Sequence, residues 1–429
     1  MDRIGFKNWA LIWLLGMAGQ ICWNVENSWF NAFVYAKIAP SPYIVSWMVG
    51  VSAAVTTLSA FLVGTWSDRV GRRKPFIAAG YVLWGLFTVV FGATQFLPKS
   101  PLFLLAAVVV AADAVMSFFG SLGYDGAFCP WTTDISSAAN RGKIGGAFAA
   151  MPVLATIFGA VVSGIVIDAI DFFPFFIAMG AVVAAAGMAT LVLLKDEPTL
   201  APKRDGAGYW RQFASVFSYR TLLANRELAW VFMVMLVYFI GFNVYFPYIT
   251  IYFTSYLGFD YSMTGIIQGV GLVAALLFTF PAARLIDRGK SPAVILAAIA
   301  VTCAGLLVIS LTRSLVPLFF GVFCAGLGYI LMIQTLTAWL KNLFPDGQRG
   351  QFEGVRALFA TCVPMIAGPA IASVAIAAFG AKRAVNGVEG LVPTEPLFLV
   401  SLAATALTVF PLIPARALFR KRLFPDHHR

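Results

Sequence analysis

Long apolar segments alternate with short polar ones along most of the chain. A helix of roughly 20 apolar residues is enough to cross the hydrocarbon core of a bilayer. Twelve segments reach that length, at residues 9–36, 44–66, 75–96, 101–124, 143–167, 173–194, 229–254, 262–285, 292–312, 315–341, 351–378 and 397–420. The pattern predicts an all-α membrane protein with twelve transmembrane helices.

The composition agrees with a lipid environment. Of the 429 residues, 60% are hydrophobic and only 11% are charged, whereas soluble domains carry about 25% charged residues. The first apolar segment is too long for a signal peptide, and no small-residue cleavage site follows it, so we expect it to be retained. We therefore expect a multi-pass protein of the cytoplasmic membrane, in contact with lipid.

The net charge of +11 follows from the membrane topology. All but six of the 30 Lys and Arg residues fall on the side of the N-terminus when the segments alternate across the membrane. Arg356 lies within a helix, and the other five lie in the opposite loops: Lys37, Lys99, Arg313, Lys382 and Arg383. This asymmetry predicts that both termini are cytosolic. The basic charge therefore gives no reason to expect a nucleic-acid partner.

Two halves follow one plan. Six apolar segments precede residues 195–228 and six follow, so we expect an N-terminal bundle at 1–194, a cytosolic linker at 195–228 and a C-terminal bundle at 229–429. Residues 209–219 of the linker could form an interfacial amphipathic helix. Three residue pairs share an offset of 219 positions: Asn24 with Asn243, Gly50 with Gly269, and Asp68 with Asp287. Such repeats are typical of transporters whose substrate site lies between the halves.

A charged motif follows the second apolar segment. Residues 64–74 read GTWSDRVGRRK, with the fixed positions Gly64, Asp68, Arg69, Gly71, Arg72 and Arg73. This pattern resembles the loop signature of the major facilitator superfamily between its second and third helices. The second copy keeps Asp287 and Arg288, but Ala283 replaces its leading glycine. The resemblance implies two pseudo-symmetric six-helix bundles that transport a solute by alternating access.

The charges of the motif are candidates for a cytoplasmic gate. The resemblance places the eleventh helix, which carries Glu353 and Arg356, beside Asp68, where the carboxylate could cap that helix. Asp287 would contact the fifth helix more weakly. Arg141 and Arg349 open two further matching segments, NRGKIGG and QRGQFEG, and belong to the same candidate set. The alternative is that these charges only set the topology.

Polar residues are concentrated in a few helices. The third, sixth, ninth and twelfth are nearly free of them, which favours positions against lipid. On the first helix, spacings of four, three and four place four amides on one face: Gln20, Asn24, Asn27 and Asn31. We expect this face, together with Glu26, Asn243, Tyr245, Tyr248 and Gln334, to bind substrate. The amides could instead join helices by hydrogen bonds, and the tyrosines could form an interfacial belt.

Two carboxylates are candidates for proton coupling. Asp113 falls halfway along the fourth helix, and Glu26 lies in the outer half of the first. A carboxyl in the membrane can bind and release a proton as access changes sides, although Asp113 could also be a neutral, hydrogen-bonded structural group. Asp125 and Asp134 are expected in a structured cytosolic loop. The second helix carries no carboxylate before Asp68, which favours protons over sodium.

Enzymatic and metal chemistry find little support in the sequence. The only histidines are His427 and His428, and the five cysteines are scattered without CxxC spacing, so we expect no cofactor and no metal site. No GxxxxGK[ST] loop for ATP occurs. Within the superfamily, DRVGRRKPF and PWTTDISSAANRGK are most similar to the glycoside–pentoside–hexuronide and sucrose-type branch. That resemblance implies a transporter of a sugar or glycoside, and we expect it to be proton-coupled and monomeric.

Other functions stay open at this point. An exporter or flippase of a lipid or drug-like compound and an uncoupled facilitator are the alternatives. The sequence leaves open the exact substrate, the direction of transport, the coupling ion and the oligomeric state.

Overall fold

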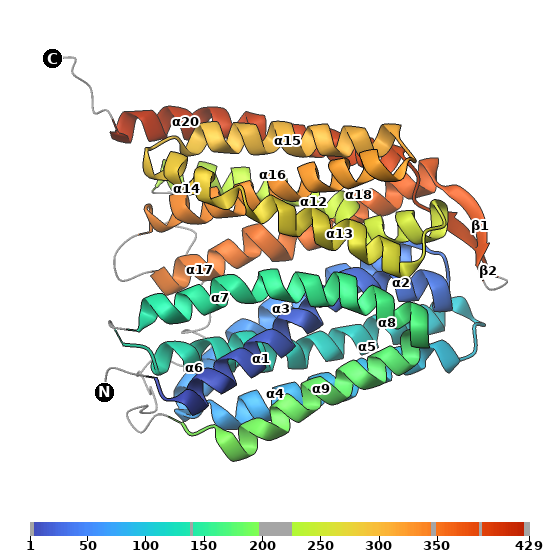
Figure 1. Ribbon diagram of the computed structural model, residues 1–429, viewed down its shortest axis with the longest axis horizontal. Coiled ribbons are helices and arrows are strands. Elements are labelled where there is room, and N and C mark those ends of the chain that lie inside the picture. The colour runs from blue at the N-terminus through green and yellow to red at the C-terminus, as the bar shows by residue number, and fades with distance from the viewer. Residues whose placement is uncertain (1–3, 138–139, 197–224, 345–348, 386–387, 424–429) are drawn as a thin grey trace. The chain divides into compact units, whose positions relative to one another are not determined.

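Helices account for most of the structure. The computed structural model describes residues 4–137, 140–196, 225–344, 349–385 and 388–423. In the first half, the α-helices are α1 (Phe6–Val25), α2 (Asn31–Phe33), α3 (Pro42–Val70), α4 (Lys74–Ala93), α5 (Leu102–Gly123), α6 (Cys129–Asp134), α7 (Arg141–Thr156), α8 (Ser163–Ile170) and α9 (Phe172–Leu193) (Figure 1). In the second half, they are α12 (Arg226–Ile251), α13 (Tyr261–Leu276), α14 (Thr279–Asp287), α15 (Ser291–Leu311), α16 (Leu315–Lys341), α17 (Arg349–Ala357), α18 (Val363–Phe379), α19 (Pro396–Ala406) and α20 (Val409–Leu423).

A small sheet departs from the all-α expectation. Strands β1 (Ala381–Val385) and β2 (Val388–Val392) pair with each other in the segment between α18 and α19. Six of these ten residues are Val, Ala or Gly and three are charged, a composition that hydropathy alone assigns to a loop. The hairpin adds a short extramembrane element to an otherwise helical fold.

The predicted spans agree closely with the observed helices. Within the described residues, eleven helices are long and apolar enough to cross a membrane, from Pro42–Val70 to Pro396–Arg422. The first predicted span, 9–36, corresponds to a continuous helical segment that runs from Phe6 to Ile38. That segment is long enough to be a span, but its mean hydropathy is too low to count among the eleven because it carries Gln20, Glu26 and several asparagines.

Several of the long helices contain π-helical turns. These turns lie at Glu26–Phe30, Val34–Ile38, Tyr124–Phe128, Ile157–Val162, Tyr252–Tyr256 and Leu358–Cys362. They interrupt the predicted first, fourth, fifth, seventh and eleventh spans. A π turn inserts an extra residue into the helix and is frequent at functional sites. The third, sixth, ninth and twelfth spans, which the sequence marks as apolar, contain no π-helical turn in the described residues.

Local sequence signals explain where the helices begin and end. Proline occupies the first turn of α3, α4, α15 and α19, where its missing N–H costs nothing. At the end of α3, Gly71 adopts φ 68°, a left-handed conformation that glycine reaches without strain. The charged motif thus contains a helix stop signal as well as charges.

The described residues form two compact units. One contains the described residues up to Asp196 together with Phe259–Ile266 and Ala384–Gly390, and the other contains the rest of the second half. Of these two added segments, Phe259–Ile266 is held to the first unit by Asp168 of α8. Its carboxylate accepts the backbone N–H groups of Tyr261 (3.1 Å) and Ser262 (2.6 Å), at the positive end of α13.

The expected linker lies mostly outside the described residues. Residues 197–224, which include the predicted interfacial helix at 209–219, fall in that part of the chain. Helix α12 begins at Arg226, three residues before the expected start of the C-terminal bundle. The Asn225 side chain caps it by accepting the N–H of Leu228 at 3.1 Å.

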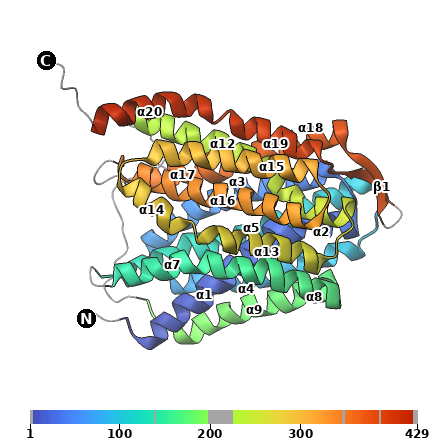
Figure 2. The same ribbon diagram turned by 45° about the horizontal axis from the view of Figure 1, so that its top comes forward.

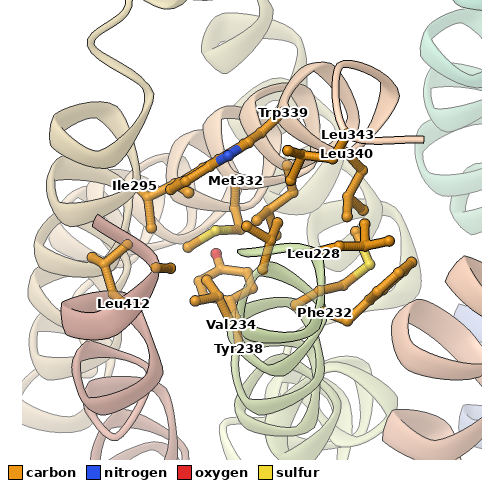
Figure 3. Packing of buried hydrophobic residues seen from close by; sticks show 14 of the residues in the cluster. Leu228, Phe232, Val234, Tyr238, Ile295, Met332, Trp339, Leu340, Leu343 and Leu412 are labelled. Carbon is orange, nitrogen blue, oxygen red and sulfur yellow. The ribbon is translucent and has the colours of Figure 1, made fainter. Parts of the chain in front are cut away.

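Each unit has its own tightly packed interior. In the first, α4 and α9 approach so closely that a Cβ added to Gly85 would lie 2.2 Å from the carbonyl oxygen of Gly180; small residues allow such contacts between membrane helices. In the second, α12, α15, α16 and α20 enclose an apolar cluster around Phe232, Tyr238 and Trp339 (Figure 3). Figure 2 shows α15 and α16 running alongside each other in this unit.

Candidate functional site

A buried carboxylate on the first helix joins three helices of the first unit. Glu26 begins the first π-helical turn and is 8% exposed. Its Oε1 accepts hydrogen bonds from Ser52 of α3 and Ser117 of α5, both at 2.8 Å. The two serine hydroxyls also lie 2.7 Å apart. Glu26 is therefore held at the centre of a polar cluster that hydropathy alone does not reveal.

A second carboxylate, Asp113, lies close to this cluster. It is 1% exposed on α5, one helical turn before Ser117, and near enough to Glu26 for the two groups to interact electrostatically. One oxygen of each carboxyl, Glu26 Oε2 and Asp113 Oδ1, is buried without a hydrogen-bond partner. Buried polar atoms in proteins are almost always satisfied. These two oxygens therefore mark a place for a proton or another small ligand.

The two serines are not among the site residues selected from the sequence. Ser117 had a signal, since it lies four residues after Asp113 and therefore on the same helical face. The sequence carried no signal for Ser52, because a single serine in the apolar second span looks the same whether it packs between helices or takes part in a site. The second helix contributes to the cluster through a hydroxyl although it carries no carboxylate before Asp68.

The amides of the first helix make different contacts from one another. Gln20 Nε2 donates to the hydroxyl of Tyr124 at 2.7 Å. Asn27 and Asn31 donate to backbone carbonyls of their own helix at 2.7 and 3.0 Å, and Asn31 is 1% exposed. A single polar face requires regular α-helical periodicity, and the π turns that begin at Glu26 shift that register. Asn31 Oδ1 and Asn24 Oδ1 are buried without a partner.

The seventh helix holds its candidates in a buried setting. Asn243, Tyr245 and Tyr248 of α12 are at most 5% exposed, and Asn243 Nδ2 donates to the carbonyl of Phe239 at 2.8 Å. The rings of Tyr245 and Phe242 meet edge to face at 5.4 Å. On α16, Gln334 donates to the carbonyl of Thr279 at 3.2 Å, while its Oε1 is buried without a partner.

The two repeated asparagines occupy matching environments. A Cβ added to Gly159 would lie 2.2 Å from Asn24 Oδ1, and one added to Gly368 would lie 2.6 Å from Asn243 Cβ. Each asparagine thus packs against a glycine of the fifth or the eleventh span, within its own unit. The contacts repeat with the sequence, which supports the internal duplication.

We expect Gly368→Ala to lower the stability of the second half by about 1–3 kcal/mol, the usual cost of overpacking. The new methyl group would also meet the backbone carbon of Asn243 at 2.7 Å, which cannot move as a side chain can. Thermal unfolding of the purified protein measures the effect. Gly326→Ala is the matched control, because its Cβ would meet Leu272 at an ordinary 3.5 Å. Equal melting temperatures for the two variants would contradict the packing argument.

The charged motif forms a network inside the first unit. Arg73 is only 4% exposed, and its guanidinium contacts Asp68 at 2.5 Å and Asp134 at 2.9 Å. The backbone N–H groups of Arg73 and Lys74 donate to Asp196 at 2.8 and 2.9 Å, so this carboxylate caps α4. The network joins the ends of α3, α4 and α6 to the segment that follows α9.

The other candidate gate residues differ in their surroundings. Gly64 has room for a side chain, since an added Cβ would meet no atom within 4 Å. Arg72, Asp287 and Arg288 are exposed, whereas Arg69 and Arg356 are half-buried. The side chains of Arg141, Arg349 and Glu353 lie outside the described part of the structure.

Two aspartates expected in a loop are helical. Asp125 lies in the π-helical turn that extends α5, and Asp134 is the last residue of α6. Glycine and proline disfavour helix interiors, and Gly126 and Pro130 lie between the two aspartates. Instead, the backbone of Gly126 packs against α3, where a Cβ would lie 2.9 Å from that of Val63.

At the end of the first span opposite this network, an ion pair lies outside the helices that cross the membrane. Lys37 Nζ contacts Asp171 at 2.6 Å. Partial burial acts to raise the pKa of Asp171, but the bonds from Lys37 and the Phe172 N–H outweigh it, so that the pKa is lowered overall. This carboxylate therefore stays ionised and fixes the start of α9.

Comparisons with known proteins give a consistent result. The sequence model of the Major Facilitator Superfamily matches residues 11–369 and 231–429, and no curated protein matches. A substituted form of the nucleoside transporter NupG is 10% identical, with a TM-score of 0.74 over 95% of this chain and 99% of that one. A bacterial homologue of the human lysosomal transporter Spinster, inward-facing and unoccupied, is 16% identical, with a TM-score of 0.71 over 97% of each chain. At these identities the solved structures show a shared fold.

Proposed function

Because the chain belongs to the major facilitator superfamily, we propose that it is a proton-coupled secondary transporter for a small polar solute that contains a sugar ring. The family establishes a multi-pass transporter of small molecules rather than an enzyme. The proton, the sugar ring and the kinship with the glycoside–pentoside–hexuronide and sucrose-type branch are the proposed part.

The carboxylate pair is the observation that carries the proton coupling. Glu26 and Asp113 are both buried and close enough to interact. The nearest hydrogen-bond partners of Glu26 are the neutral hydroxyls of Ser52 and Ser117. Two adjacent buried negative charges are very costly without a cation. The pair therefore holds at least one proton in this arrangement and can release it when the surroundings become aqueous.

The residues of the second unit favour a ring-bearing solute. Phe242 stacks on Phe246 and on Tyr329, with centroid distances of 4.6 Å in both cases, and all three rings are half-exposed. Aromatic faces suit the apolar face of a sugar, whose hydroxyl groups need amide and phenol partners such as Asn243, Tyr245 and Gln334. Nucleosides are also glycosides, so the NupG likeness adds them to the candidates.

Alternating access is part of the same proposal. We expect the N-terminal and C-terminal bundles to expose the carboxylate pair to each side of the membrane in turn. Asp68 and the eleventh helix remain the proposed cytoplasmic gate. In that case the Arg73 network would hold Asp68 in position while the gate closes.

Transport by reconstituted vesicles tests the function. Vesicles loaded with a hexose, a disaccharide, a pentoside, a nucleoside or a lysolipid are assayed for counterflow of the same labelled compound, and for accumulation under an imposed pH gradient. We expect counterflow with one of the four sugar-containing solutes, and accumulation that follows the pH gradient and does not require a sodium gradient. Counterflow of the lysolipid alone, or uptake that ignores the pH gradient, would contradict the proposal.

A further inference from the structure

Polar side chains recur at every fourth position along α5 and its π-helical extension. They are Asp113, Ser117, Ser121 and Asp125, in the otherwise largely apolar run LFLLAAVVVAADAVMSFFGSLGYDGAF. Side chains four residues apart lie on the same face of a helix, one turn above the other. The four groups therefore form one file along the helix, and only its first two members belong to the carboxylate cluster described above.

Helix α3 lines this file with polar groups of its own. Ser121 Oγ donates to the carbonyl of Thr56 at 2.9 Å, and Ser59 Oγ donates to the carbonyl of Phe118 at 3.0 Å. With the Ser52–Ser117 contact at 2.7 Å, these bonds define a polar seam between α3 and α5. Ser52, Ser59, Ser117 and Ser121 are all at most 5% exposed, so the seam is enclosed by protein.

The seam ends at a carboxylate that is partly open to solvent. Asp125 follows Ser121 by one helical turn on the same face of the segment and is half-buried. Its neighbour Gly126 accepts a bond from Ser67 at 3.1 Å, and Ser67 also contacts Arg73. Asp125 is thus level with the charged end of α3, the end that the positive-inside rule assigns to the cytosol. Twelve residues of helix place it about 18 Å from Asp113.

We propose that the α3–α5 seam is a proton relay and that Asp125 is its cytosolic proton-binding site. The relay rests on the proposed function, since it serves the Glu26–Asp113 pair. A proton leaving the pair binds Ser117 Oγ as that hydroxyl releases its own proton towards Ser121. One water molecule bridges the turn of about 6 Å between the two serines. Ser121 then turns its hydroxyl from the Thr56 carbonyl and donates its proton to the Asp125 carboxylate while it takes one from the water, so the hydroxyls and the water end neutral and one proton has moved.

Titratable groups surround both ends of the relay. Tyr81 of α4 and Tyr124 and Cys129 of its own segment interact electrostatically with Asp125. Cys22 and Asp113 interact with Glu26. The unpartnered oxygens Glu26 Oε2 and Asp113 Oδ1 supply the acceptor positions from which the relay starts.

Infrared spectroscopy of the full-length protein in lipid tests the relay without a substrate. The C=O stretch of a protonated carboxyl shifts when its proton is replaced by deuterium, so a change to D₂O reports how fast the buried pair exchanges with the cytosolic side. We expect exchange in Asp125→Asn to be slower on the order of 10-fold or more, because positioned proton-transfer groups typically contribute 10²–10⁴-fold.

Two further variants make the test specific. Ser121→Ala should also slow the exchange, and it removes no charge. Ser163→Ala is the matched control, since Ser163 is also a buried serine whose hydroxyl donates to a backbone carbonyl, that of Phe158, but it lies on α8, outside the α3–α5 seam; it should exchange at the wild-type rate. Wild-type rates in both Asp125→Asn and Ser121→Ala would overturn the relay.

The same spectra separate the relay from the proposed function. The band must disappear in the double variant Glu26→Gln with Asp113→Asn if the pair holds the proton. A band that survives in the double variant contradicts the coupling site and the relay together. A band that is lost there, but exchanges at the wild-type rate in both relay variants, contradicts the relay alone.

Discussion

Asp113→Asn is expected to abolish accumulation driven by a pH gradient while substrate exchange continues. Asparagine imitates the neutral carboxyl in shape, so the buried cluster with Glu26 and Ser117 keeps its packing, but it cannot release a proton. With one proton per substrate, each unit of pH gradient supports about a 10-fold substrate gradient, and this gradient should fall to passive equilibration. Glu26→Gln should behave similarly.

Uptake and counterflow in the same vesicles measure the two activities separately. Asp171→Asn is the matched control, because Asp171 is an exposed aspartate paired with Lys37 outside the membrane-spanning helices. That variant should accumulate substrate as the wild type does. If Asp113→Asn and Glu26→Gln both still accumulate substrate along the proton gradient, the carboxylate pair is not the coupling site.

Arg73→Met is expected to destabilise the first half by about 2–3 kcal/mol. The change leaves Asp68 and Asp134 without their shared cation and Ser67 without a donor, at a position where the arginine is only 4% exposed. Breaking a buried ion pair costs about 3–5 kcal/mol. We place the effect below that range because the side chains of Asp68 and Asp134 are 32% and 20% exposed.

The neighbouring arginine offers a control for the loss of charge. Arg72 is exposed, so Arg72→Met should leave the melting temperature of the purified protein nearly unchanged. If Arg72→Met and Arg73→Met melted at the same temperature, the network would not contribute to stability, and the charges of the motif would act through topology alone.

Sequence alone predicted the approximate limits of the eleven spans that the described residues contain. Apolar length is a local property, so segments such as 44–66 and 315–341 correspond to Pro42–Val70 and Leu315–Lys341. The internal repeat was also readable, because Asn24 with Asn243, Gly50 with Gly269 and Asp68 with Asp287 share one offset. Glu26 and Asp113 could be selected as candidates because a carboxylate in an apolar helix is rare and usually functional.

Only the tertiary structure decided how these residues combine. Glu26, Ser52 and Ser117 are far apart in the sequence, and they meet because particular faces of three helices pack together. The π-helical turns shift the register of the first helix after Val25, and its amides make unlike contacts: Gln20 bonds Tyr124, whereas Asn27 and Asn31 bond carbonyls of their own helix. Arg73 is buried because Asp68, Asp134 and Asp196 converge on the end of α3. Hydrophobicity places a segment in the membrane, but the contacts between segments depend on side-chain shape and hydrogen bonding across helices, which the order of residues along one helix does not contain.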